Sequence, residues 1–244
     1  MTKANKVKVA ATQMSCSWEI EENITKAKKI IHGHVKYFAY QWNNVGNPPD
    51  WFSNPFNNRQ LDINKKHWID IDDFNTGIGD IKTIWELSRF SWLLVLTRAY
   101  LVMGDKKYLD LINVWLKNWV KNNPLNSGPN WKCGQETAIR IFHVLMSSYL
   151  LEQYKKPSEA SVRFVFEHCQ RIYPNIRYAI AQDNNHGISE AAALYISGNW
   201  FIKLNLLIYV LQILFDLSFE QSSTKINSIF FLICLQILFK QSFK

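Results

Sequence analysis

Residues 80–103, DIKTIWELSRFSWLLVLTRAYLVM, carry the clearest helical pattern of this chain. Asp80 is a residue type that caps helices, and the pattern predicts a helix that runs to about Met103, where Gly104-Asp105 makes a tight turn. Further helices are expected up to about residue 122 and over 131–154, 157–182 and 187–197. Because the connections are short, neighbouring helices should form antiparallel hairpins. The sequence therefore predicts a mainly α fold, built as a bundle, a solenoid or a toroid.

The segments before residue 80 have a different character. Residues 6–13 predict a short strand, and residues 20–31 predict an amphipathic helix. Between residues 33 and 80, Pro and Asn recur and prevent helix formation, although aromatic side chains are frequent. A connection of this length in a compact domain is usually functional or disordered. Its aromatic content favours an ordered loop that wraps a helical body.

The composition favours an anionic partner. The 244 residues carry a formal net charge of +8, and aromatic residues make up 14% of them. Trp and Tyr suit both carbohydrate rings and a helical core, so the aromatic content alone leaves both explanations open. Lys and Arg are spread along the chain and no zinc-finger or RNP pattern occurs, which argues against nucleic acid. An acidic polysaccharide fits the charge as well.

Nothing in the sequence predicts a metal, a cofactor or a membrane span. The four cysteines, at positions 16, 133, 169 and 234, form no CxxC pair, so free thiols in a reducing compartment are expected. The N-terminus is too short and polar for a signal peptide, which makes the cytoplasm the default expectation. The apolar runs 204–215 and 229–239 are shorter than the ~20 residues that a membrane helix needs, so we expect core-facing helices there.

Two acid–base pairs recur at helical spacing near the starts of predicted helices. Glu86 and Arg89 are three residues apart, and Glu136 and Arg140 are four apart, so the members of each pair should lie side by side. For one such pair, a surface ion pair is the commoner explanation. The repetition, with a Trp near each pair, favours one shared cleft that is lined by Arg and Trp.

The triplet Asn184-Asn185-His186 combines two side-chain amides with an imidazole. These groups suit the binding of an anionic oxygen, such as that of a sugar carboxylate, better than the binding of a metal. For the triplet alone, a helix-capping Asn followed by a chance His is the commoner explanation.

From His34 to about Trp200, the chain resembles the N-terminal domain of the heparinase II/III family of polysaccharide lyases. The resemblance is carried, in the family's order, by 47–51 (NPPDW), 79–89 (GDIKTIWELSR), Asn130-Trp131 with Glu136 and Arg140, and Asn184-Asn185-His186. It implies an incomplete (α/α) toroid of helical hairpins, normally followed by a large β-sandwich domain. It also implies cleavage of uronic-acid-containing glycans of the heparin, heparan or alginate kind by β-elimination, in relatives that are often periplasmic or secreted.

The resemblance also implies roles for individual residues. Asn185 and His186 would neutralise the sugar carboxylate and handle protons during the elimination. The substrate-binding residues that it implies are Glu86, Arg89, Trp131, Glu136, Arg140 and Asn184. Among them, the charged side chains would position the sugar and Trp131 would stack on it.

Other parts of the chain depart from the family pattern. Residues 212–223 resemble the stretch that precedes a catalytic Tyr, with Leu217 in place of Gly and Ile226 where the Tyr is expected. No β-sandwich segment is recognised after it. Residues 1–31 instead resemble the start of carbon–nitrogen hydrolases of the N-carbamoylputrescine amidase type. We therefore expect three parts: 1–31, a toroid domain over 32–223, and an apolar tail over 224–244.

These departures predict a truncated or fused lyase domain of weak or no activity. An Ile cannot exchange a proton, and the missing β-sandwich would contribute a further His to the family's site. The alternative is a non-catalytic module that binds acidic glycans through Arg, Lys and Trp. The sequence leaves the oligomeric state open.

Overall fold

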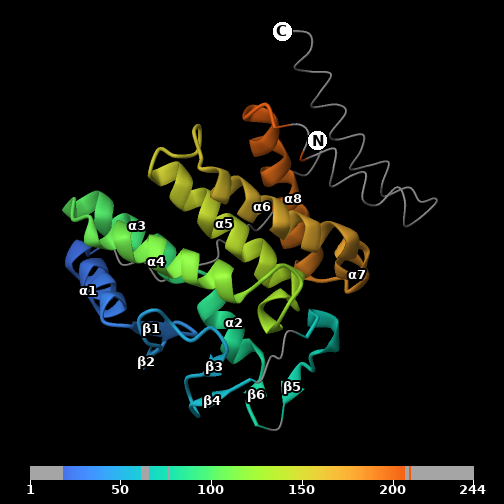
Figure 1. The fold of residues 1–244 in the computed structure, drawn as a ribbon, viewed down its shortest axis with the longest axis horizontal. Coiled ribbons are helices and arrows are strands. Elements are labelled where there is room, and N and C mark those ends of the chain that lie inside the picture. Colours follow the sequence, from blue (N-terminus) through green and yellow to red (C-terminus); the bar gives the residue numbers. More distant parts are fainter. Residues whose placement is uncertain (1–18, 62–65, 76, 207–208, 210–244) are drawn as a thin grey trace, which may run out of the picture.

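The structure is a computed structural model that describes residues 19–61, 66–75, 77–206 and 209. Its helices are α1 (Ile20–Ile31), α2 (Lys82–Ser88), α3 (Ser91–Met103), α4 (Lys107–Asn122), α5 (Gly134–Leu150), α6 (Glu159–Ile172), α7 (Ile176–Ala181) and α8 (Asn185–Lys203). The helices pack as a row in which α3 contacts α1, α4 and α5, and α8 contacts α5, α6 and α7 (Figure 1). This row of helical hairpins confirms the predicted mainly α fold and agrees with an incomplete (α/α) toroid.

The strongest helical pattern, residues 80–103, does not form one helix. It is divided into α2 and α3, because Phe90 between them adopts a left-handed backbone with a φ of 66°. The Phe90 side chain is fully buried and packs against Trp119 and Phe164. A left-handed residue costs roughly 1–2 kcal/mol, whereas burial of a Phe side chain contributes about 1.5–3 kcal/mol. Burial of the ring therefore stabilises the break.

The other predicted helices are confirmed, one with its predicted bounds and the rest with changed ends or a break. The helix predicted over 20–31 forms as α1 with those bounds. The helix predicted from Trp131 begins later, at Gly134, after a 3-10 turn over Pro129–Trp131. The helix predicted over 157–182 is divided into α6 and α7 by a 3-10 turn over Tyr173–Asn175, because Pro174 lacks the N–H that a continuous helix requires. The last one begins at Asn185 and is longer than predicted.

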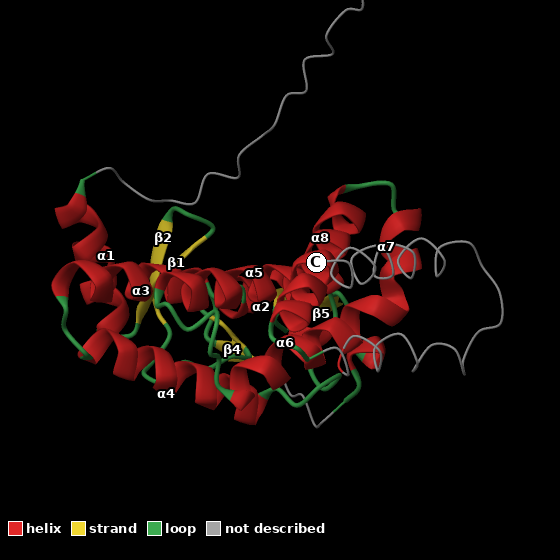
Figure 2. Cartoon of the chain, turned by 90° about the horizontal axis from the view of Figure 1, so that it is seen from above, coloured by secondary structure: helices red, strands yellow, loops and turns green. Residues whose placement is uncertain are grey.

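The aromatic-rich segment before α2 is ordered, as predicted, but it contains strands that the sequence did not predict. These are β1 (His34–Tyr37), β2 (Gln41–Asn44), β3 (Ser53–Asn54), β4 (Arg59–Gln60), β5 (Phe74–Asn75) and β6 (Gly79–Asp80), paired in sequence order as three antiparallel hairpins. The first two hairpins contact α2. Figure 2, like Figure 1, shows the β1–β2 hairpin beside α1, which β1 also contacts.

Tryptophan forms much of the core. Six Trp side chains are fully buried: Trp51, Trp92, Trp115, Trp119, Trp131 and Trp200. Their ring nitrogens still find acceptors, for example Asn118 for Trp51 at 2.7 Å and Asn47 for Trp115 at 2.8 Å. These six Trp residues therefore belong to the helical core and are not exposed for contact with a carbohydrate.

Several predicted features lie outside the described residues. They include the strand over 6–13, the apolar run 229–239, most of the run 204–215, and Ile226. Among the helices that the structure describes, none is both long and apolar enough to cross a membrane.

Candidate functional site

The first group of site residues is built around Arg89, at the C-terminal end of α2. Its guanidinium donates to both carboxylate oxygens of Glu136 in α5, from Nε at 2.6 Å and from Nη2 at 2.7 Å, and Nη1 donates to Glu86. The other oxygen of Glu86 accepts from the backbone N–H of Phe38, at 3.2 Å. The Arg89 cluster, meaning Glu86, Arg89 and Glu136, therefore joins the first hairpin, α2 and α5. The spacing of Glu86 and Arg89 predicted their contact correctly.

Burial and ion pairing compete within the Arg89 cluster. Burial raises the pKa of the Glu86 carboxyl, and the charge of Arg89 opposes that rise. Burial lowers the pKa of Arg89, but the hydrogen bonds and charges of Glu136, with the charge of Glu86, outweigh it and raise the pKa overall. Arg89 therefore stays charged. The imidazole of His143 in α5 fixes the same helix end, because its Nδ1 lies against the carbonyl oxygen of Arg89.

The predicted contact between Glu136 and Arg140 does not form as an ion pair. Both oxygens of Glu136 are engaged by Arg89, and the side chain of Arg140 points into the core, where it is fully buried. Its Nε donates to Nε2 of His168 at 3.0 Å, and its Nη2 donates to the carbonyl oxygen of Asn130 at 2.8 Å. Burial lowers the pKa of Arg140 to about 9 and, together with the charge of Arg140, lowers that of His168 well below its ordinary value. A neutral His168 suits its role as acceptor.

Trp131 is buried beside Arg140. The guanidinium of Arg140 lies 5.4 Å from its ring centre, and the indole N–H donates to the carbonyl oxygen of Asn123 at 3.2 Å. Neither side chain is accessible to a ligand. The roles of Arg140 in positioning a sugar and of Trp131 in stacking on it stay predictions, for which both side chains would have to become accessible.

The second group of site residues lies at the start of α8. Asn184 caps this helix, and its side-chain oxygen accepts from the backbone N–H of His186 at 2.9 Å, so the capping explanation holds for this residue. Asn185 is the first residue of the helix and is exposed. The His186 side chain is 28% exposed, and its Nδ1 lies 4.0 Å from the carboxylate of Glu190 and 4.0 Å from Sγ of Cys133.

Glu190 is a buried carboxyl group that the sequence analysis missed. It lies one helical turn after His186, and a Cβ atom on Gly134 would lie 2.5 Å from its carboxylate, so only glycine leaves room for it there. Burial raises the pKa of Glu190 to about 7, and the charge of Arg171 opposes this rise. The spacing of four residues from His186 was the signal that could have identified Glu190.

Cys133, which precedes α5, lies between the two groups. Its Sγ contacts His186 on one side, and the charges of Glu136 and Glu190 both act on it. Burial is the main cause that raises the pKa of the Cys133 thiol, so the thiol is neutral and poorly nucleophilic. Arg171 holds the adjacent backbone by donating from Nε to the carbonyl oxygen of Trp131 at 2.7 Å and from Nη2 to that of Lys132 at 2.8 Å.

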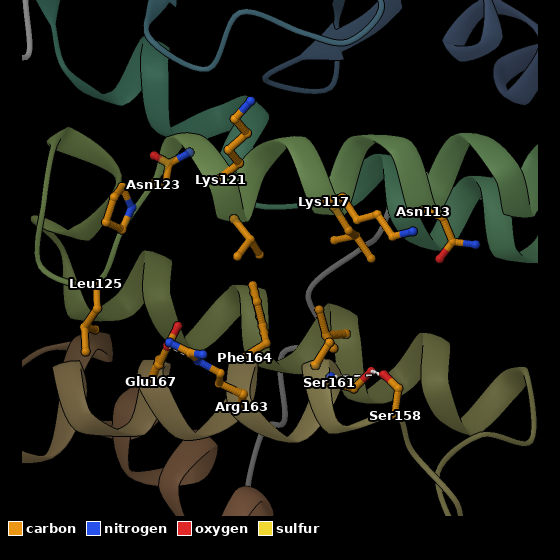
Figure 3. Close-up of a pocket in the computed structure, with 15 residues that line it drawn as sticks. Asn113, Lys117, Lys121, Asn123, Leu125, Ser158, Ser161, Arg163, Phe164 and Glu167 are labelled. Atoms are coloured by element: carbon orange, nitrogen blue, oxygen red, sulfur yellow. Dashed lines mark hydrogen bonds and ion pairs between the residues drawn. The ribbon is translucent and has the colours of Figure 1, made fainter.

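A separate cavity of about 690 Å³ lies between α4 and α6 (Figure 3). Its lining is mostly apolar, with Lys117, Lys121 and Arg163 among the polar side chains. None of the residues around Arg89 or His186 lines it. We therefore place the candidate site at Arg89, Cys133 and His186 and leave this cavity outside it.

Residues 2–205 match the family model described as Heparinase II/III N-terminus. The chain belongs to the heparinase II/III family. It is 30% identical, over 118 residues, to a heparin-sulfate lyase from Bacteroides thetaiotaomicron, which covers 46% of this chain and 17% of that protein. Its fold is similar to crystal structures of the heparan sulfate lyase HepC from Pedobacter heparinus and of a mutant of it, with TM-scores of 0.55 and 0.54, at 17% identity over 87% of this chain and 31% of those chains.

Two facts follow from the extent of these matches. The chain spans less than a third of the length of each of these relatives. The family match begins at residue 2, within the segment 1–31 that resembles carbon–nitrogen hydrolases, and α1 packs on α3 and β1. The division of the chain at residues 31 and 223 stays a prediction.

Proposed function

We propose that this chain supplies the helical half of a lyase that cleaves uronic-acid-containing glycans by β-elimination, with Asn185 and His186 at the reacting sugar. The observation that carries the proposal is the partly exposed imidazole of His186, which stands beside an exposed amide and has the buried carboxyl of Glu190 behind it. The names of the similar proteins support a sulfated uronate glycan, of the heparin or heparan kind, as the substrate class.

The reaction sets definite requirements for the site. A base removes the proton from C5 of the uronic acid, the electron pair forms a double bond between C4 and C5, and the bond from C4 to the glycosidic oxygen breaks. That oxygen leaves with a proton from an acid. The C5 proton is barely acidic while the neighbouring carboxylate carries its full charge, so the site must supply donors to that carboxylate.

Asn185 and His186 fit these requirements better than the arginines do. The charges of the Arg89 cluster sum to −1, because one guanidinium faces two carboxylates, so the cluster does not attract an anion. Arg140 is buried. The Asn185 amide would donate to the sugar carboxylate. The Nδ1 atom of His186 faces Glu190 and Cys133, which leaves Nε2 for proton exchange with the sugar.

Glu190 would hold the imidazole in place during this exchange. A positive charge on His186 would be stabilised by an ionised Glu190, which lies 4.0 Å away and can ionise near neutral pH. Glu86, Arg89 and Glu136 would hold α2 against α5 beside the reacting sugar, and any contact that they make with further sugars would be with hydroxyl groups, not with anionic groups. Asn184 would contribute through the helix cap that orients His186.

A second function has one observation in its favour. Ile226 stands where the resemblance to the family implies a proton-exchanging Tyr. A chain without that group would bind acidic glycans and leave them uncleaved. In this case Asn185 and His186 would still recognise the carboxylate.

Ultraviolet absorbance distinguishes the two functions. The full chain is incubated with heparan sulfate, and the absorbance of unsaturated uronate products is followed beside retention of the chain on immobilised heparan sulfate. A lyase produces absorbance, and His186→Ala should lower the rate at least ~100-fold, as expected for loss of a general acid–base group. The matched control is His67→Ala, on the histidine that caps the 3-10 turn Trp68–Asp70, outside the candidate site. Retention without absorbance identifies a binding module, and the absence of both contradicts both proposals.

A further inference from the structure

Three aromatic side chains form a row on the surface of the first two hairpins. Phe38 and Tyr40 belong to the turn between β1 and β2, and Phe56 belongs to the turn between β3 and β4. The ring centres of Phe38 and Tyr40 are 6.5 Å apart with an angle of 26° between their planes, and those of Phe38 and Phe56 are 6.1 Å apart at 10°. The rings are thus close to parallel. Tyr40 is 69% exposed and Phe56 is 40% exposed.

The turn that presents these rings is held in a costly backbone conformation. Phe38 and Ala39 both have positive φ, at 48° and 64°, although neither is glycine. Each such residue costs roughly 1–2 kcal/mol. The hydrogen bond from the Phe38 N–H to Glu86 and the buried ring of Tyr37, edge-on to Phe38 and Phe56, fix the turn from below. Contacts from β1, α2 and the second hairpin therefore stabilise this turn conformation.

Folding alone does not explain the position of Tyr40. A side chain that stays 69% exposed removes little apolar surface from water, so its burial contributes little to stability. Strained backbone that is over-determined by its surroundings is typical of ligand-binding segments. An exposed, flat, apolar surface that ends in a hydroxyl suits the face of a sugar ring, which carries C–H groups with hydroxyls at its edge.

We propose that Phe38, Tyr40 and Phe56 form an aromatic platform that binds a sugar ring of the acidic glycan, at a position remote from the reacting sugar. This inference rests on the proposed function, because it assigns a second contact to the same polymer. Arg59 follows Phe56 by three residues in the same hairpin and is exposed, with Nη1 3.4 Å from the carbonyl oxygen of Gly77. It provides a positive charge suited to a sulfate or carboxylate group of that ring.

The platform is connected to His186 by a line of contacts. Phe38 bonds to Glu86, Glu86 and Glu136 both bond to Arg89, and Glu136 and His186 both act on Cys133. Along this line the side chains of Arg89 and His186 are 30% and 28% exposed. Between them Glu86 and Glu136 are largely buried, so the line offers separate accessible points, at the platform, Arg89 and His186, which suits an extended polymer rather than a single sugar. The platform should therefore make binding depend on the length of the glycan.

Calorimetric titration of the full chain with heparan sulfate oligosaccharides tests this dependence. The variants are the double change Tyr40→Ala with Phe56→Ala, and Tyr149→Ala as the control, since Tyr149 is 66% exposed at the other end of α5 from Cys133. We expect the double variant to bind a decasaccharide about tenfold more weakly than the unchanged chain, as for loss of one to two aromatic contacts. Affinity for a disaccharide, and both affinities of the control, should stay unchanged. A thermal unfolding curve checks that the double variant is folded.

Two further variants separate stacking from general apolar contact. Tyr40→Trp keeps a flat ring and should retain the decasaccharide affinity, whereas Tyr40→Leu keeps an apolar side chain without a flat face and should lose it. If the double variant binds the decasaccharide as the unchanged chain does, the proposal of a sugar-binding platform is overturned while the proposed function stands. Contact with another protein would then be the better explanation of the exposed rings. If the unchanged chain binds neither oligosaccharide, the proposed function itself fails.

Discussion

Arg89 and His186 both lie at ends of helices that meet near Cys133, but their partners hold them in different ways. Arg89 donates three hydrogen bonds of 2.7 Å or less to two carboxylates. The nearest partners of the His186 ring lie 4.0 Å away, one of them a carboxyl whose pKa is raised to about 7. A side chain held by three short hydrogen bonds to carboxylates holds structure together, whereas a ring whose nearest partners lie 4.0 Å away can bind a ligand. From the sequence, Arg89 was expected to bind the sugar and His186 to handle protons.

The largest expected effect comes from removal of the Arg89 guanidinium. Arg89→Met would leave the carboxylates of Glu86 and Glu136 largely buried without a counter-charge, so the free energy of unfolding in urea should fall by about 3–5 kcal/mol. Arg163→Ala is the matched control, because Arg163 also pairs with a Glu but is exposed, and it should leave the free energy unchanged within error. An equal loss of stability in the two variants would show that Arg89 contributes no more than an exposed ion pair does, and its contrast with His186 would no longer hold.

A smaller effect on stability is expected from Glu190, the carboxyl group beside His186. Its pKa is about 7 in the folded chain against an ordinary value of 4.5, mainly because it is buried. The folded state therefore keeps this proton to a higher pH than the unfolded state does, and the resulting stabilisation is complete below about pH 4.5 and lost as the pH rises through about 7. The free energy of unfolding should fall by at most ~1.4 kcal/mol per pH unit over this window.

Glu190→Gln isolates that contribution, because the amide fills the same space without titrating. Urea unfolding of the unchanged chain and of this variant, measured at several pH values, gives two slopes, and the difference between them belongs to Glu190. Parallel curves across the window would show that Glu190 has an ordinary pKa. The idea of a carboxyl that can ionise beside His186 near neutral pH would then be lost.

The smallest expected effect compares two neighbouring amides. Asn184→Ala removes the cap of α8 and should lower the free energy of unfolding by about 1 kcal/mol. Asn185→Ala changes an exposed side chain, so it should leave the free energy of unfolding unchanged and weaken retention on heparan sulfate. The reverse pattern, with stability dependent on Asn185 and retention on Asn184, would exchange the roles that we assign to them.

The fold could be predicted from the sequence where local patterns decide the structure. The amphipathic pattern over 20–31 predicted α1 with its bounds, and Pro124 and the residues after it predicted the break after α4. The division at Phe90 was missed, since a positive φ on a Phe depends on the core that receives its ring. The strands before α2 are two to four residues long, which is too short for an alternating pattern to appear.

The site could be predicted only in part, because it also depends on contacts between different helices. Spacing along one helix predicted the contact of Glu86 with Arg89, and the same rule applied to Glu136 and Arg140 was wrong. The rule describes neighbours on one helix and contains no information about a second helix that brings a competing arginine to Glu136. Burial is likewise a property of the assembled helices, so the sequence could not separate the buried Trp131 from an exposed, sugar-facing tryptophan.

The hydrogen bonds around Arg89 also set an order on folding. Arg89 is 47 residues from Glu136 along the chain, and Phe38 is 48 residues from Glu86. Such distant contacts must close large loops before they contribute, which makes them late and slow to form. In a chain synthesised from its N-terminus, the turn of Phe38 and Ala39 must wait for α2, and Arg89 must wait for α5. The Arg89 cluster is therefore completed only after more than half of the described chain has been made.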